Sequence, residues 1–184
     1  ELIVFPRITK ATPKEDHIHR HGEPGLFEPN DVARVLISCT FTWDKPKSEW
    51  LKQQWQNKYP NAEVLVGGPA YGDRGKSFEP GRFLKKGYVI TSRGCPGCDD
   101  PCLVPKREGD IRELPIKRGF NIQDNNLLAC SKSHIRSVIE MLGKQKKRPI
   151  FGGGLEAKRL LGLPDIVNAI VDLKPKQLFL AYDN

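Results

Sequence analysis

Apolar residues in the first half of the chain alternate between strand-like runs and a segment of helical spacing. Residues 35–42, VLISCTFT, are rich in β-branched side chains and predict a buried strand. Ser48 is a suitable N-cap for a helix over 49–58, whose large apolar residues recur at helical spacing. Residues 63–66 predict a second strand, which a Gly-Gly-Pro sequence ends. A strand, a helix and a strand within about 30 residues predict a βαβ unit with parallel strands.

The second half of the chain alternates in the same way. Ser131 or Ser133 is a suitable cap for the first of its helices. Strands are predicted over 88–91, 111–116, 120–123, 149–151 and 177–182, and helices over 131–145 and 164–173. This alternation predicts an α/β fold with a mainly parallel sheet.

Residues 1–34 lack a sustained hydrophobic period. They contain four prolines and several charges, so we expect them to form an extended lead-in. His17, His19 and His21 alternate, and on an extended strand they would share one face. Such histidines can bind a metal, but an exposed polar arm explains them equally well.

Polar side chains follow several of the predicted strands at the points where those strands end. Cys95 follows one strand, Asp124 and Asn125 follow another, and Glu156 and Asp183 follow two more. In parallel α/β sheets the carboxyl ends of the strands form the face that carries the functional site. We therefore expect these residues to lie along one functional edge.

Composition and charge narrow the class of protein. The net charge of +8 favours anionic partners such as nucleic acid or phosphorylated metabolites, although solubility alone accounts for it as well. No apolar run approaches the ~18–20 residues of a membrane span, and the N-terminus does not resemble a secretory signal. The sequence therefore predicts a cytoplasmic protein without a membrane partner.

Three of the five cysteines lie close together, in the order C-x2-C-x3-C. Cys95, Cys98 and Cys102 occupy a Gly/Pro-rich loop, and three thiolates so close together favour a bound metal in a reducing compartment. Structural zinc would need a fourth ligand, for which Cys39, Cys130 or a histidine is available. A 4Fe–4S cluster can be held by three cysteines, which leaves one iron open to a small molecule. Unmetallated structural thiols are the third alternative.

In this context the chain resembles the radical S-adenosylmethionine (radical SAM) superfamily. The resemblance covers roughly residues 35–184, and the cysteine loop at the end of a strand is its most specific part. The motifs that carry it are Arg93-Gly-Cys-Pro96, Val104-Pro-Lys-Arg-Glu-Gly109, Asp124-Asn-Asn-Leu-Leu128, Gly153-Gly-Leu-Glu-Ala157 and Ala181-Tyr-Asp183.

The resemblance implies a fold for each part of the chain. Residues 35–87 would form a small Rossmann-like βαβ segment, which stands where related proteins have a cobalamin-binding domain. Residues 88–184 would form the first four strand units of a partial parallel (β/α) barrel.

The resemblance also implies a cofactor set and a reaction. The three cysteines would bind a 4Fe–4S cluster whose open iron takes S-adenosylmethionine, and reduction by an electron donor would cleave that molecule to a 5′-deoxyadenosyl radical. The candidates for binding S-adenosylmethionine are Asp124, Asn125, Asn126, Glu156 and Asp183. Asp and Asn after a strand also commonly cap turns, which is the alternative role of each.

The chain departs from the family pattern in two respects. The common spacing is C-x3-C-x2-C, so the middle cysteine of this chain is displaced by one residue. The usual barrel also has more strand units than the four predicted here. We therefore expect a shortened barrel, a fragment that lacks a C-terminal portion, or a barrel completed by a partner subunit in a homo-oligomer.

A second hypothesis is a non-catalytic nucleic-acid-binding module that is stabilised by zinc or an Fe–S cluster. The basic charge and the aromatic residues Trp43, Trp50, Trp55 and Tyr59 motivate it. The two hypotheses overlap if the enzyme's anionic substrate is itself nucleic acid.

Overall fold

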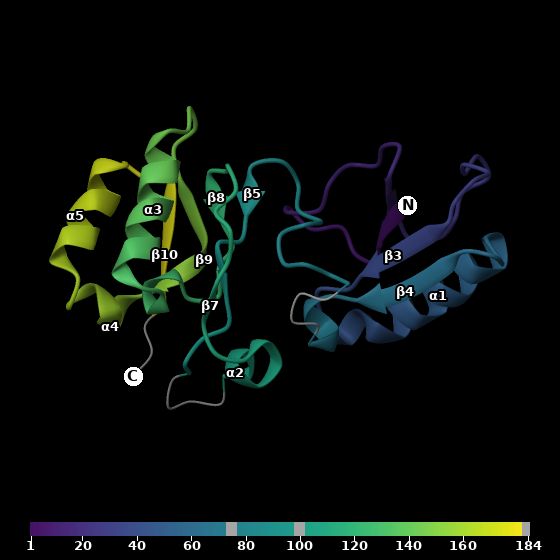
Figure 1. Cartoon of the computed structure of the whole chain (residues 1–184), viewed down its shortest axis with the longest axis horizontal. Coiled ribbons are helices and arrows are strands. Elements are labelled where there is room, and N and C mark those ends of the chain that lie inside the picture. Colours follow the sequence, from purple (N-terminus) through teal and green to yellow (C-terminus); the bar gives the residue numbers. More distant parts are fainter. Residues whose placement is uncertain (73–76, 98–101, 182–184) are drawn as a thin grey trace. The chain divides into compact units, whose positions relative to one another are not determined.

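The computed structural model of the chain describes residues 1–72, 77–97 and 102–181 (Figure 1). The chain divides into two compact units, Glu1–Lys85 and Lys86–Asn184. The sequence predicted a boundary slightly further along, between residues 87 and 88. Each unit contains a parallel sheet together with helices, so the predicted α/β class is confirmed.

The N-terminal unit is built on a four-stranded sheet in which neighbouring strands are parallel. In spatial order its strands are β2 (His19–His21), β1 (Leu2–Phe5), β3 (Arg34–Ser38) and β4 (Glu63–Gly67). β3 and β4 pair in parallel from Arg34↔Glu63 to Ser38↔Gly67. Helix α1 (Lys45–Lys58) connects them, so the predicted βαβ unit is confirmed.

The first residues of the chain differ from the expected extended lead-in over 1–34. Leu2–Phe5 forms β1, a strand in the interior of the sheet, and all four of its residues are buried. A continuous apolar run suits a strand that is covered on both faces, whereas a half-exposed strand would alternate apolar with polar residues. The N-terminal segment is therefore part of the core of this unit.

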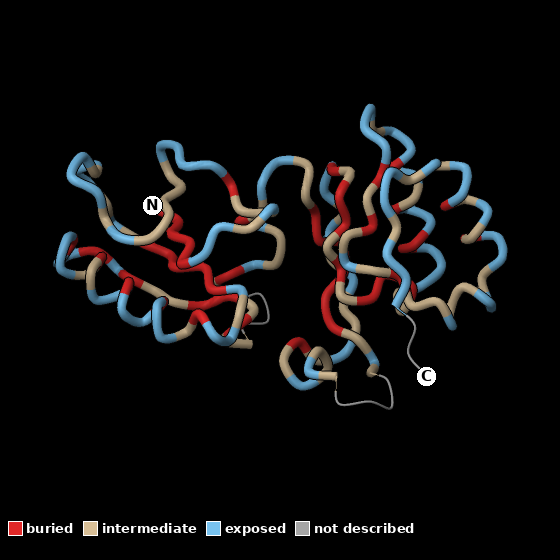
Figure 2. The backbone as a smooth tube through the Cα atoms, turned by 180° about the vertical axis from the view of Figure 1, so that it is seen from behind, coloured by how far each residue is buried: buried red, intermediate tan, exposed pale blue. Residues whose placement is uncertain are grey.

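Side chains cover both faces of this sheet, and Figure 2 shows its central strands as buried. Alternate residues of a strand point to opposite faces, so β1 and β3 each contribute to two apolar clusters. On one face Leu2, Val4, Val35 and Ile37 pack with Leu51 and Trp55 of α1. On the other face Ile3, Phe5 and Leu36 pack with Phe78 and Phe83.

Helix α1 begins earlier than the sequence predicted. A short 3-10 helix, η1 (Thr42–Asp44), leads directly into Lys45, so the prediction of Ser48 as the N-cap is wrong. Ser48 is fully buried inside the helix, and its hydroxyl donates to the Asp44 carbonyl oxygen at 2.9 Å. Pro46 in the first turn explains the early start, because its fixed φ suits the beginning of a helix.

The C-terminal unit contains a second four-stranded parallel sheet. In spatial order its strands are β10 (Gln177–Ala181), β9 (Ile150–Glu156), β8 (Asn121–Ile122) and β5 (Tyr88–Val89). The predicted strand over 111–116 is shorter, and it pairs outside this sheet: β7 (Arg112–Glu113) is antiparallel to β6 (Ser92–Arg93). The remaining short helices of the chain are η2 (Pro69–Tyr71), α2 (Leu103–Glu108), η3 (Leu127–Ala129) and α4 (Ala157–Leu160).

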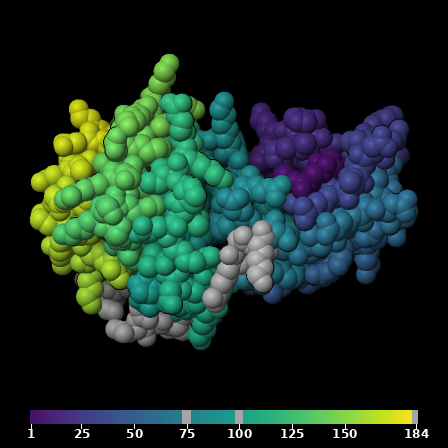
Figure 3. Space-filling model, viewed as in Figure 1, coloured from purple at the N-terminus to yellow at the C-terminus, as the bar shows by residue number. Residues whose placement is uncertain are grey.

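Helices α3 (Lys132–Gly143) and α5 (Pro164–Asp172) pack on this second sheet, and their side chains form much of the surface of the C-terminal unit in Figure 3. The N-cap prediction is confirmed for Ser131, whose Oγ accepts from the His134 N–H at 3.2 Å. In the parts of the chain that the structure describes, no helix has both the length and the apolar character of a bilayer span.

Candidate functional site

The candidate site lies at the carboxyl ends of β5, β8 and β9, which are neighbours in the second sheet (Figure 1). Because these strands are parallel, the segments that follow them meet at one edge. The segment after β5 carries Cys95, the segment after β8 carries Asp124, Asn125 and Asn126, and β9 ends at Glu156. The side chains from these three strand ends are joined by hydrogen bonds.

Asn126 connects the cysteine loop with the end of β9. Its Nδ2 lies 3.4 Å from the Sγ of Cys95 and 2.8 Å from Oε2 of Glu156, and it donates to both. Asn126 is 6 % exposed. Its Oδ1 is buried and accepts no hydrogen bond within the described part of the chain. A buried acceptor without a donor is costly, so this oxygen is a candidate contact for a bound group.

Asn125 holds the backbone that leads into Cys95. Its Oδ1 accepts from the Gly94 N–H at 3.1 Å and from Nη1 of Arg93 at 3.3 Å. Gly94 has a φ of +88°, and a Cβ at this position would lie 2.1 Å from the Asp110 carbonyl oxygen. Only glycine fits this close approach, which fixes the direction in which the chain enters the cysteine loop.

Asp124 binds protein groups rather than facing an open site. Its carboxyl group accepts from the Thr91 N–H at 2.6 Å, the Thr91 hydroxyl at 2.5 Å and the Ser92 hydroxyl at 2.8 Å. Burial raises the pKa of Asp124, while the hydrogen bonds from Thr91 and Ser92 oppose that shift. Asp124 therefore fastens the end of β5 to the end of β8, and its prediction as a contact of S-adenosylmethionine stays a prediction.

Glu156 faces a cation and an amide. Its Oε2 accepts from Asn126 and from Nε of Arg159, the latter at 2.5 Å. Burial raises the pKa of Glu156, but the hydrogen bonds from Asn126 and Arg159 outweigh burial, so the pKa falls below its ordinary value. The group is a carboxylate at neutral pH and can accept a further donor.

The structure describes two of the three loop cysteines. Cys95 and Cys102 are free thiols of intermediate exposure, and Cys102 is the N-cap of α2. Cys98 lies outside the described residues, as does Asp183. Among the residues that are described, no group of three or more His, Cys, Asp or Glu side chains is placed to hold a metal.

The other two cysteines differ from the loop cysteines in their surroundings. Cys39 belongs to the N-terminal unit, is buried, and donates its thiol to the Phe41 carbonyl oxygen at 3.3 Å. Cys130 belongs to the C-terminal unit, and burial raises the pKa of its thiol to about 11. A protonated thiol is a poor metal ligand, so Cys130 is better suited to packing.

The four aromatic residues that motivated nucleic-acid binding do not form one surface. Trp55 is fully buried and Tyr59 is 7 % exposed, and both belong to the core between α1 and the first sheet. The Trp55 indole donates to the Gly22 carbonyl oxygen at 2.9 Å. Trp43 and Trp50 are exposed, so only these two remain available for stacking.

The alternating histidines have local partners. Nδ1 of His19 lies 3.0 Å from the Asp16 carboxylate, and Nε2 of His21 lies 2.8 Å from the Pro13 carbonyl oxygen. His17 precedes β2 and is exposed. His19 and His21 lie in β2 with side chains only 16 % and 17 % exposed, so this segment is not the exposed polar arm that was the alternative to a metal site.

The sequence did not single out three residues that build the site. Thr91 and Ser92 bind Asp124, and Arg159 binds Glu156. The contact between Glu156 and Arg159 was predictable from the sequence, because side chains three positions apart at the start of a helix lie on the same side. The contacts of Thr91 and Ser92 were not predictable, since both residues are remote from Asp124 in the sequence. Comparison of the chain with known protein families, with curated proteins and with solved structures finds no match.

Proposed function

We propose that the chain is a radical S-adenosylmethionine enzyme that holds a 4Fe–4S cluster on Cys95, Cys98 and Cys102. The observation that carries the proposal is the position of Asn126, whose amide contacts both the Cys95 sulfur and Glu156. A sulfur of the cysteine loop and polar groups from two other strand ends thus lie within one hydrogen-bonded set. That is the combination needed to bind a cluster and a polar cosubstrate side by side.

The residues present fit such a group in their chemistry. Cys95 and Cys102 are free thiols that are partly accessible, which a cluster ligand requires. The Asn126 amide supplies an N–H to the Cys95 sulfur, and N–H···S bonds are a common support of cluster ligands. When bound, the cluster supplies an open iron for S-adenosylmethionine and the electron that cleaves it to a 5′-deoxyadenosyl radical.

The chain's own residues would orient the cosubstrate. The Glu156 carboxylate can accept from an ammonium or a hydroxyl group, and the buried Oδ1 of Asn126 can accept from another donor. Asp124 and Asn125 keep their protein contacts and hold the ends of β5 and β8 in place. Asn126 and Glu156 are therefore the proposed binding residues, and Asp124 and Asn125 are positioning residues.

The winding of the second sheet supports a partial barrel. Its four parallel strands follow one another in space in the same order as in the sequence, β5, β8, β9 and β10. Sequential parallel winding in one direction is how a (β/α) barrel is built, whereas a doubly wound sheet reverses direction. We propose that this unit is the first part of a radical SAM barrel.

The test is anaerobic reconstitution of the full chain with iron and sulfide, followed by reduction with S-adenosylmethionine present. We expect about three to four iron atoms per chain, a brown charge-transfer absorption and release of 5′-deoxyadenosine. Cys95→Ala should abolish the absorption, whereas Cys130→Ala, which removes a thiol outside the loop, should leave it intact. A colourless protein that retains zinc and releases no deoxyadenosine would refute the proposal.

The partners follow from the same chemistry. The reaction needs an electron donor, and the basic charge favours an anionic substrate. A nucleic-acid-binding module without catalysis has less support, because Trp55 and Tyr59 are core residues.

A further inference from the structure

A basic surface lies at the amino ends of the strands in the second sheet, opposite the edge that carries the candidate site (Figure 1). The segments that lead into β5, β8, β9 and β10 are residues 86–87, 117–120, 144–149 and 174–176. Because the four strands are parallel neighbours, these segments lie side by side. Together the four segments form the basic edge.

The basic edge carries positive charge and no acidic residue. Its four segments contain one, two, four and two Lys or Arg residues, and none of the 22 Asp and Glu residues of the chain. All nine of these basic residues are exposed. Solubility requires a net charge on the chain as a whole, but it does not require that charge to be concentrated at one edge. The concentration of positive charge therefore indicates an anionic partner.

Backbone contacts hold the four segments together. Each segment is joined to the next, by Phe120 N–H to Gly87 O at 2.9 Å, Ile150 N–H to Phe120 O at 2.7 Å, and Lys176 N–H to Pro149 O at 2.7 Å. The charges are therefore presented from a fixed frame. A partner that binds them does not have to order the backbone first, which lowers the entropic cost of binding.

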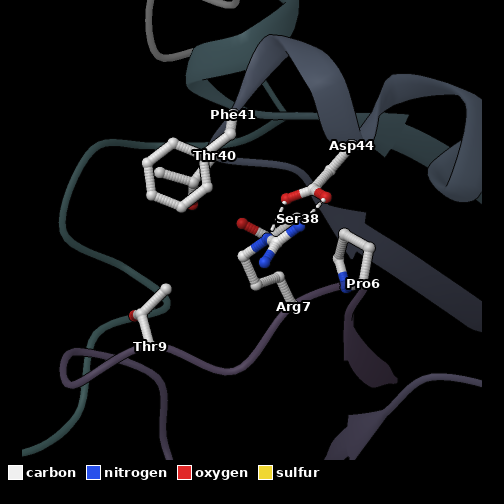
Figure 4. Close-up of a pocket in the computed structure, with 7 residues that line it drawn as sticks. All are labelled: Pro6, Arg7, Thr9, Ser38, Thr40, Phe41 and Asp44. Atoms are coloured by element: carbon white, nitrogen blue, oxygen red, sulfur yellow. Dashed lines mark hydrogen bonds and ion pairs between the residues drawn. The ribbon is translucent and has the colours of Figure 1, made fainter.

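Arg148 keeps its charge although its guanidinium group is bound. Its Nε donates to the Lys174 carbonyl oxygen at 2.6 Å and its Nη2 to the Pro175 carbonyl oxygen at 3.2 Å. Arg7 in the N-terminal unit is the contrasting case, because its hydrogen bonds go to the two carboxylate oxygens of Asp44 at 2.7 and 2.8 Å (Figure 4). Carbonyl oxygens orient a guanidinium group without neutralising it, so Arg148 can still attract an anion.

Two lysines of the basic edge contact other side chains. Nζ of Lys144 lies 2.5 Å from Oε1 of Glu140 on helix α3, so a carboxylate offsets this charge. Nζ of Lys147 lies 4.8 Å from the centroid of the Phe120 ring. Lys147 covers a face of this ring, which would otherwise be available to stack on an unpaired base. A duplex keeps its bases stacked and needs no such ring.

The basic edge lacks the apolar centre of a protein-binding surface. Large apolar side chains are exposed elsewhere on the described residues, but none of them belongs to these four segments. Protein interfaces usually contain buried aromatic or apolar anchors and few lysines. Binding of a nucleic-acid backbone needs only Lys and Arg side chains that face phosphates. The surface therefore fits a nucleic acid better than an acidic protein.

The length of the basic edge suits a duplex. Neighbouring strands lie about 4.8 Å apart, so four strands present their leading segments over about 14 Å. A duplex carries about eight phosphate charges over that length of its axis. We propose that the basic edge binds the phosphate backbone of a nucleic acid duplex without reading its bases. The surface lies at the opposite edge of the sheet from the cysteine loop, so the proposal does not depend on the proposed reaction.

The experiment is a fluorescence anisotropy titration of a labelled DNA duplex of about 20 base pairs with the full chain, at several salt concentrations. If each segment neutralises one phosphate, log K should fall with log salt concentration with a slope of about −3.6. The affinity should then fall about 100-fold between about 50 and 200 mM salt. Duplexes of different sequence should bind within about twofold of each other, and a single strand of the same length should bind more weakly.

A triple variant tests whether this edge is the binding surface. Arg118→Ala, Lys146→Ala and Lys176→Ala together remove one charge from each of three segments. Because these side chains are exposed, the variant should fold as the wild type does. Its affinity for the duplex should fall at least about tenfold at about 100 mM salt, and its slope should change to about −1.

A second triple variant controls for net charge. Lys47→Ala, Lys52→Ala and Lys58→Ala together remove three exposed charges from helix α1, which lowers the net charge of the chain by the same amount. Its affinity for the duplex should stay within about twofold of the wild type. Equal losses in the two triple variants, or a slope near zero, would overturn the proposal. So would a single strand that binds more tightly than the duplex, or poly-glutamate that displaces the duplex at equal charge concentration.

Discussion

Gly153 lets β9 pass close beneath the segment that follows β8, and its replacement tests how tightly the candidate site is built. A Cβ on Gly153 would lie 2.0 Å from the Asp124 carbonyl oxygen and 3.0 Å from the Asp124 backbone nitrogen. Ordinary contact begins at 3.4 Å, so the two segments would have to move apart before the new methyl group could fit. The Asp124 side chain resists that movement because three hydrogen bonds hold it to Thr91 and Ser92.

Gly153→Ala should therefore destabilise the C-terminal unit by about 3 kcal/mol, at the upper end of the ordinary cost of overpacking. Urea unfolding followed by far-UV circular dichroism reports the helices α3 and α5 of this unit, among others. The three tryptophans all belong to the N-terminal unit, so their fluorescence reports the other unit separately. We expect the circular dichroism midpoint to fall more than the fluorescence midpoint.

Gly162→Ala is the matched control. A Cβ there would meet only the Arg159 carbonyl oxygen, at 3.8 Å, and the residue is exposed. Its stability should change by no more than about 0.5 kcal/mol. Equal midpoints for Gly153→Ala and Gly162→Ala would show that β9 does not approach the Asp124 backbone as described, and the reasoning would fail.

Three further predictions concern the supporting structure. Because burial raises the pKa of Asp124, its contribution to stability is complete below the unfolded pKa near 3.8 and is lost as pH rises through the folded pKa. The unfolding free energy of the wild type relative to Asp124→Asn should therefore fall as the pH rises above 3.8 in urea titrations, and a constant difference would contradict the assignment. Ser131→Ala should cost about 1 kcal/mol by loss of the α3 cap, measured against Ser137→Ala, an exposed serine of the same helix. Trp55→Ala should cost about 3–5 kcal/mol and Trp50→Ala less than about 1, and similar values would place Trp55 outside the core.

The pattern of apolar residues predicted most helices and strands, because both units are built from parallel strands and helices whose apolar residues recur at the usual spacings. The βαβ unit and the cap at Ser131 depend on local sequence, and both are confirmed. β1 was missed because Pro6 and Arg7 directly follow its four residues, and a run so short has no period of its own. Only pairing with β2 and β3 makes it a strand.

The candidate site was predictable in position but not in detail. Parallel winding brings the ends of β5, β8 and β9 to one edge whatever residues they carry, which is why Asn126 contacts both Cys95 and Glu156. The sequence could not show that Asp124 turns toward Thr91 and Ser92, because an Asp after a strand serves equally as a ligand or as a fastening group. That choice depends on contacts between segments that are remote from each other in the sequence.

A polar side chain at a strand end can either hold protein segments together or contact a ligand. Whether it already has a hydrogen-bond partner in the protein separates these two roles. Asp124 and Asn125 follow β8, and their side-chain oxygens accept from protein donors, so they need nothing further. Asn126 is also buried at a strand end, yet its Oδ1 has no partner within the described residues. Such a group costs about 1–3 kcal/mol when left unpaired, a cost that a bound ligand can remove. Removing the Asp124 carboxyl group should therefore lower stability first, whereas removing the Asn126 side-chain amide should first weaken the binding that we propose for its Oδ1.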